Sequence, residues 1–125
     1  MVTNYKELEV WKRSVALTTE LYKLTSRFPN TERYGLTSQI RRAITSVPAN
    51  IAEGWGRGST GEYVQFLTVA RGSLMEVETH LIVSRNLNFV SDAAQAPFSK
   101  EIEGIGKMLN ALIVALKSRR AGIRD

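Results

Sequence analysis

Hydrogen-bonding side chains recur every three or four residues between positions 39 and 57 of the chain. The members of this row are Gln39, Arg42, Ser46, Asn50, Glu53 and Arg57. On a helix, that spacing places them along one side. Short amides, hydroxyls and forked guanidinium groups suit a partly buried hydrogen-bonded network, and a smaller row continues the pattern with Ser73, Glu76 and His80. We predict a structural polar network between helices or subunits; a ligand site formed by Arg42, Asn50 and Glu53 is the alternative.

Cationic side chains are the second group that could do chemistry, because a guanidinium fork matches the geometry of a phosphate. The chain carries 17 basic and 12 acidic residues, a net charge of +5. Residues 117–125 hold four of the basic residues, and we predict that they form a short basic tail. The candidate nucleic-acid contacts are Arg41, Arg42, Arg57, Arg71, Arg85, Lys117, Arg119 and Arg120. For Arg41, Arg42, Arg71 and Arg85, an ordinary solvated ion pair is the alternative.

The composition argues against several kinds of catalytic and metal site. Cysteine is absent, which excludes thiolate nucleophiles, thiolate metal sites and disulfide bonds. With His80 as the single histidine, no site can use two imidazoles. Glu76 and His80 are four residues apart, whereas di-metal sites in bundles use Glu-x-x-His pairs. We therefore expect no catalytic residue and no metal, and a protein that is not an enzyme.

Four glycines between positions 54 and 61 mark the clearest loop of the chain. The loop lacks the Gly-Lys-Ser/Thr ending of a phosphate-binding loop, and it follows a helical segment rather than a strand. We predict a helix-to-helix turn, with Ser59 capping the next helix and Glu62 reaching back to the cap. A phosphate contact through Arg57 is the alternative.

Apolar residues at helical spacing define four segments that must position these groups. The segments run from about Leu8 to Phe28, from about Thr31 to Trp55, from Ser59 to about Asn86, and onward from a start between Ser91 and Pro97. No segment shows sustained period-two alternation, so we predict no sheet. The pattern predicts an all-α, up-and-down antiparallel four-helix bundle, formed by residues 1–125 as a single domain.

Pro48 lies inside the second segment. Its ring removes the hydrogen bond to the carbonyl of Ile44, so we predict that the second helix is kinked at Pro48, with the bend near Ser46. A complete break, with Ser46 as a new cap, is the alternative.

Many of these residues, taken together, resemble a known family. The stretch Asn50-Ile51-Ala52-Glu53-Gly54 is the most specific part of the match. The match also includes Phe28-Pro29, Tyr34-Gly35-Leu36, Gln39-Ile40-Arg41-Arg42-Ala43, Ser46-Val47-Pro48-Ala49, Arg57-Gly58-Ser59, Glu62-Tyr63, Phe66-Leu67, Ala70-Arg71-Gly72-Ser73-Leu74, Glu76, Leu109 and Leu112. Over nearly its whole length the chain resembles the four-helix-bundle family encoded by intervening sequences in bacterial 23S ribosomal RNA genes. Relatives of that family include the accessory proteins of diversity-generating retroelements.

The resemblance implies an up-and-down bundle that assembles as a homo-pentamer with a central channel. It implies no known enzymatic activity and no cofactor. The retroelement relatives bind nucleic acid and a reverse transcriptase through basic surface, and this implies a possible nucleic-acid or protein partner for the present chain. The residues add an argument for a homo-oligomer, because Val10, Val64 and Val69 lie off the main apolar seams of the first and third helices.

The start of the sequence, MVTNYKELEVWK, has charged residues where a signal peptide needs an apolar region, and no apolar run is long enough to cross a bilayer. We therefore predict a soluble, cytoplasmic protein without a membrane partner. The functional prediction is a non-enzymatic, homo-oligomeric bundle that binds RNA or DNA through backbone contacts. The alternative is a structural or protein-binding scaffold with no nucleic-acid role.

Overall fold

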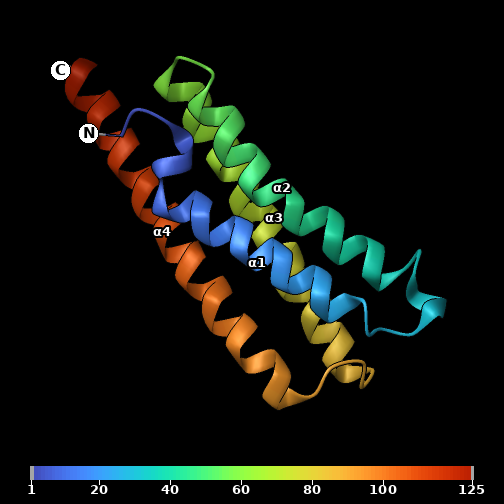
Figure 1. Ribbon diagram of the computed structural model, residues 1–125. Helices are drawn as coiled ribbons and strands as arrows, with labels where there is room; N and C mark the ends of the chain where they lie inside the picture. Colours follow the sequence, from blue (N-terminus) through green and yellow to red (C-terminus); the bar gives the residue numbers. More distant parts are fainter. Residues whose placement is uncertain (1, 125) are drawn as a thin grey trace.

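Four long helices account for most of the chain. A computed structural model describes residues 2–124, with side chains described as far as Arg119. The elements are the short 3₁₀ helices η1 (Tyr5–Glu7) and η2 (Asn30–Glu32) and the α-helices α1 (Glu9–Thr25), α2 (Leu36–Trp55), α3 (Thr60–Asn86) and α4 (Asp92–Arg124). Between residues 2 and 124 there is no strand. Figure 1 shows the four α-helices side by side, each running opposite to the one before it. The predicted all-α antiparallel bundle is confirmed.

The core lies along the axis of the bundle and is built from the apolar side of each helix. Contact is most extensive between α2 and α3 and sparsest between α1 and α4. Ten large apolar side chains are completely buried, and they come from all four helices: Leu21, Ile40, Ile44, Val47, Ile51, Leu67, Val77, Leu81, Ile105 and Leu109. Burial of such side chains contributes roughly 1.5–3 kcal/mol each, so the periodic apolar faces supply the main driving force for packing the helices together.

The second helix begins later than the sequence predicts. Residues 30–32 form η2, and α2 starts at Leu36, after Gly35. The helix then continues through Pro48 to Trp55, so the alternative of a complete break is wrong. A bend at Pro48 stays a prediction, because an unbroken helix is compatible with a straight or a kinked axis.

The glycine-rich segment between α2 and α3 is a turn, as the sequence indicates. Gly58 has a φ of 83°, a conformation that favours glycine. The Ser59 hydroxyl accepts a hydrogen bond from the backbone N–H of Glu62 at 3.2 Å, which confirms Ser59 as the cap of α3. The Glu62 carboxylate lies 3.3 Å from the same hydroxyl, so it reaches back to the side chain of the cap.

The end of α3 has the hydrogen-bond pattern of a Schellman motif. The N–H of Phe89 donates to the carbonyl of Ser84, and the N–H of Asn88 donates to the carbonyl of Arg85, both at 2.9 Å. Asn88 adopts a φ of 63°, which asparagine tolerates better than most residues. This cap turns the chain sharply into α4.

The segment predicted as a basic tail is the last part of α4, which remains helical through Arg124. The side chains of Lys117 and Arg119 are exposed on it. The Arg120 side chain lies outside the described residues. None of the described helices has an apolar stretch long enough to span a membrane.

Candidate nucleic-acid interface

The structure joins three of the side chains predicted to form a polar network. The hydroxyls of Ser46 on α2 and Ser73 on α3 lie 2.9 Å apart. The amide of Asn50 donates to the Ser46 hydroxyl at 2.9 Å and to the Ser46 carbonyl at 2.7 Å. Ser73 is buried and the other two are partly buried. This chain of bonds ties α2 to α3 at their most extensive interface.

The remaining members of the two rows make no side-chain hydrogen bond to these three within the described residues. Gln39, Arg42 and Glu76 are exposed, and His80 is partly buried. Within the described part of the chain, none of these four side chains makes a hydrogen bond or an ion pair. Glu53 lies near Arg57 instead, at 3.6 Å, with about half of each side chain exposed.

Arg41 is one of the predicted phosphate contacts, but two of its N–H groups donate to protein atoms. Its Nε donates to the Thr25 hydroxyl at 2.9 Å, and its Nη2 donates to the Tyr22 carbonyl at 3.1 Å. The guanidinium also lies 4.5 Å from the centre of the Tyr22 ring. Because these partners belong to the last turn of α1, Arg41 satisfies carbonyl and hydroxyl groups there and fastens α1 to α2.

Three further predicted contacts also have partners within the chain. Arg57 lies between Glu53 and Glu62, at 3.6 and 3.9 Å, and covers the Phe66 ring at 4.9 Å. Arg71 donates a hydrogen bond to the Asn110 side chain at 2.9 Å, and Arg85 forms an ion pair with Asp92 at 3.6 Å. Nearby acids lower the attraction of Arg57 and Arg85 for a phosphate.

Arg42, Lys117 and Arg119 are exposed, and none of their side chains has a polar partner among the described residues. They do not form one surface, because Arg42 lies two turns into α2 and the other two lie in the last turns of α4. Arg119 borders a shallow depression of about 230 Å³ beside Trp55 and Tyr63, at the turn between α2 and α3.

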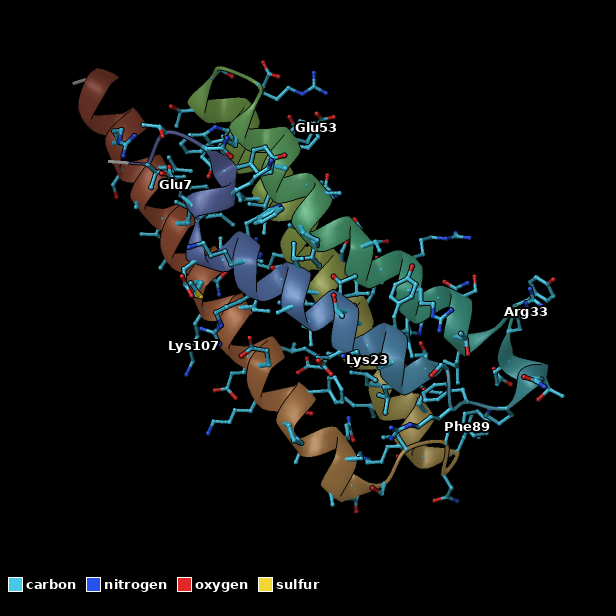
Figure 2. The ribbon with its side chains drawn as sticks, viewed as in Figure 1. Glu7, Lys23, Arg33, Glu53, Phe89 and Lys107 are labelled. Carbon is cyan, nitrogen blue, oxygen red and sulfur yellow. The ribbon has the colours of Figure 1, made fainter. Side chains whose placement is uncertain are left out.

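The end of the bundle where α1 leads into α2 carries basic and aromatic residues that the sequence reasoning did not group together. We call it the α1–α2 corner; its members are Tyr22, Lys23, Arg27, Arg33, Tyr34, Arg41 and Arg42. Residues 22–42 contain five basic side chains and one acidic one. Figure 2 shows the Arg33 side chain at the far corner of the bundle, on the segment that joins α1 to α2. Counting basic and acidic residues in successive windows along the whole sequence, instead of only at its C-terminal end, would have revealed this basic segment.

The acidic residues near the corner are already engaged. The Glu32 carboxylate accepts a hydrogen bond from the backbone N–H of Leu36 at 3.1 Å, at the positive end of α2. Glu20 lies 3.6 Å from Lys23, with both side chains largely exposed. Arg27, Arg33 and Arg42 are the cations of the corner whose side chains have neither a hydrogen bond nor an ion pair in the described residues, whereas Arg41 is bonded to Thr25 and Tyr22.

No group of three or more His, Asp or Glu side chains within the described residues is arranged to hold a metal ion. The exposed guanidinium groups of the α1–α2 corner favour anionic partners.

Comparison with known proteins places the chain beside one protein family and beside solved structures of similar fold. The model of the family described as 23S rRNA-intervening sequence protein matches residues 6–111. Among solved structures, the fold is similar to that of a protein of unknown function from the S23 ribosomal protein family of Bacteroides thetaiotaomicron VPI-5482. The similarity has a TM-score of 0.75 and 21% identity, over 83% of this chain and 97% of that one. No curated protein matches the chain.

The family match covers all of α1, α2 and α3 and more than half of α4, including the Asn50–Gly54 signature and the α1–α2 corner. The four-helix architecture agrees with the fold of the solved structure from the S23 family. On this evidence, the chain belongs to the 23S rRNA-intervening sequence protein family.

Proposed function

We propose that this protein is a non-enzymatic, homo-oligomeric bundle that binds RNA or DNA through contacts to the phosphate backbone. The observation that carries the proposal is the α1–α2 corner, where Arg27, Arg33 and Arg42 face solvent without an acidic partner in the described residues. Phosphate contacts supply most of the affinity of sequence-tolerant nucleic-acid binding, because they release counterions.

The exposed side of α3 supports the homo-oligomer. Val69, Met75, Ile82, Val83 and Leu87 are each between 39% and 58% exposed there. Of the three valines that suggested assembly in the sequence, Val10 is in the core and Val64 packs against it, while Val69 is 49% exposed. The resemblance to the family implies that the assembly is a pentamer. A ring of subunits would multiply the charge of the corner by the number of copies.

The affinity of the purified protein for labelled RNA and DNA, measured by fluorescence anisotropy between about 50 and 200 mM salt, tests the binding. We expect affinity that falls steeply with salt and depends little on base sequence. A double variant, Arg27→Glu with Arg42→Glu, should weaken binding strongly. The matched control is Lys12→Glu with Lys100→Glu, which changes the net charge equally at two exposed positions outside the corner.

Absence of binding at both salt concentrations, or affinity unchanged by salt, would overturn the proposal. The alternative function, a structural or protein-binding scaffold, would then be favoured, because it requires assembly but no contact with phosphates. If the corner variant and its control lose nucleic-acid affinity equally, the net charge of the protein, rather than the α1–α2 corner, is responsible for binding.

A further inference from the structure

The ring of Tyr34 is the most exposed large hydrophobic side chain in the described part of the chain. It is 86% exposed, at the turn between η2 and α2. Its ring has no place in the core, so packing does not account for an aromatic residue here. Arg33 lies over the ring at 5.6 Å, which joins a stacking surface to a positive charge.

We propose that the α1–α2 corner binds single-stranded nucleic acid, with an unpaired base stacked on Tyr34 and the adjoining phosphates held by Arg27, Arg33 and Arg42. This inference rests on the proposed function and specifies its surface and the form of the ligand. Aromatic rings beside a positive groove are the usual construction of sites for single strands, because every base has a flat face and every link has a phosphate.

Tyr22, the other aromatic residue of the α1–α2 corner, has a different role. Tyr22 is 40% exposed, and its ring is covered by Arg41 at 4.5 Å. The hydrogen bonds from Arg41 to Thr25 and to the Tyr22 carbonyl fix that pair on the rigid end of α1. Tyr22 therefore positions a charge at the edge of the site, and Tyr34 is the ring left open for stacking.

The charges of the corner favour a phosphate chain over an acidic protein surface. Arg27, Arg33 and Arg42 are exposed cations without acidic partners in the described residues, and Lys23 adds a charge shared with Glu20. Glu32, the acid within the segment, is turned to the N–H of Leu36. A base on Tyr34 would thus lie among phosphate-binding groups, an arrangement that suits a nucleic-acid strand because every base in it is joined to a phosphate.

A protruding tyrosine distinguishes single strands from duplexes. In a duplex both faces of each internal base are covered by its neighbours, so Tyr34 would meet only sugar and phosphate. In a single strand a base can turn out and stack on the ring. The expected preference is therefore for a flexible strand of either RNA or DNA, with little dependence on its sequence.

The test compares Tyr34→Ala with Tyr34→Phe, which keeps the ring. Affinities are measured for a single strand and for a duplex of the same length, each as RNA and as DNA, at one salt concentration. We expect Tyr34→Ala to weaken single-strand binding about 10-fold and to leave duplex binding unchanged within about two-fold. Tyr34→Phe should bind like the natural protein. A strand carrying 2-aminopurine should be quenched by the natural protein and by Tyr34→Phe, but much less by Tyr34→Ala.

Each outcome decides between the two proposals. Suppose that the natural protein binds nucleic acid, and that Tyr34→Ala lowers the affinities for single strands and duplexes equally or changes neither affinity. This inference is then wrong and the proposed function stands. If the natural protein binds neither form, both fail. Because Tyr34 is exposed, the melting temperatures of all three proteins should agree, which separates a loss of binding from a loss of fold.

Discussion

Arg13 on α1 holds Glu101 on α4 with two parallel hydrogen bonds, Nε to Oε2 at 3.0 Å and Nη2 to Oε1 at 2.5 Å. The third nitrogen of the guanidinium lies 3.3 Å from the sulfur of Met108. Gly104 makes room for this arrangement, because a Cβ at that position would lie 2.5 Å from Arg13 Nη2. The Arg13–Glu101 pair thus joins α1 to α4, the two neighbouring helices with the least contact, and the guanidinium occupies the space above Gly104.

The pair gives the fold a dependence on pH. The hydrogen bonds from Arg13 lower the pKa of Glu101 in the folded protein, and this outweighs the opposite effect of partial burial. The stabilisation is therefore fully present above the ordinary carboxyl pKa of 4.5 and is lost as the pH falls through the lowered pKa. We expect Glu101→Gln to reduce the free energy of unfolding by about 1 kcal/mol at neutral pH, and by less at about pH 3. Urea unfolding at both pH values measures the difference.

Glu103→Gln is the control for that experiment. Glu103 lies 3.1 Å from Lys107, one turn away on α4, and both side chains are about two-thirds or more exposed. We expect a change of less than about 0.5 kcal/mol, because exposed pairs of this kind contribute little. If Glu101→Gln and the natural protein lose stability in parallel as the pH falls, the assigned role of the pair is wrong.

Gly54 is required by the close approach of α2 and α3. A Cβ there would lie 2.8 Å from the Cβ of Phe66 and 3.0 Å from the ring of Tyr63. We expect Gly54→Ala to destabilise the protein by about 1–3 kcal/mol, although alanine is the better helix former. Gly72→Ala is the comparison, since a Cβ added at Gly72 would have no atom within 4 Å. Because alanine is the better helix former, we expect this variant to raise the free energy of unfolding by about 1 kcal/mol. Thermal melting of both variants decides this, and a stabilised Gly54→Ala would contradict the expectation.

Asn50 and Glu53 belong to one predicted row but should respond differently to substitution. Asn50→Ala removes two hydrogen bonds to Ser46 in a partly buried position, and we expect a loss of about 1 kcal/mol. Glu53→Ala removes only an exposed pair with Arg57, and we expect a change within about 0.5 kcal/mol. Denaturant midpoints and nucleic-acid affinity should be measured together. A normal midpoint with lost affinity in Asn50→Ala would point to the alternative of a ligand site.

Assembly should depend on the exposed side of α3. We expect the natural protein to be larger in solution than its chain mass of 14.0 kDa. Val69→Lys with Val83→Lys should shift the mass toward that of one chain, because both valines are 39–49% exposed and a lysine there opposes close packing. Val114→Lys, at a 63% exposed position of α4, is the control. Light scattering after gel filtration measures the mass, and a natural protein of one chain would overturn the proposed assembly.

The fold could be predicted because its evidence is local. Apolar positions at steps of three and four define each helix, and residues such as Ser59 and Asn88 mark its ends through bonds to near neighbours. The start of α2 was placed too early because a 3₁₀ turn and an α-helix share the same favourable residues near Thr31. The four basic residues at positions 117–124 suggest a tail because they interrupt the apolar pattern, whereas the helix α4 continues through them to Arg124.

The candidate site was harder to predict. Whether a basic side chain is available to bind a phosphate depends on partners that lie far away in the sequence. Arg71 and Asn110 are 39 positions apart, and Arg41 meets groups 16 and 19 positions before it. No spacing rule within one helix reveals such partners. Conversely, Arg33 and Tyr34 are neighbours in the chain, yet their importance follows from exposure, which a sequence does not state.

The two ends of the described chain lie at one end of the bundle, and the α1–α2 corner lies at the other (Figure 1). Cyclic symmetry about an axis along the bundle gives every subunit the same direction, so all copies of the corner would share one rim of the proposed ring. A long strand held at one corner would meet the next at a high effective concentration, and such avidity raises affinity by about 10²–10⁴ over a single contact. The ring would therefore discriminate by strand length, holding long flexible strands and releasing short ones.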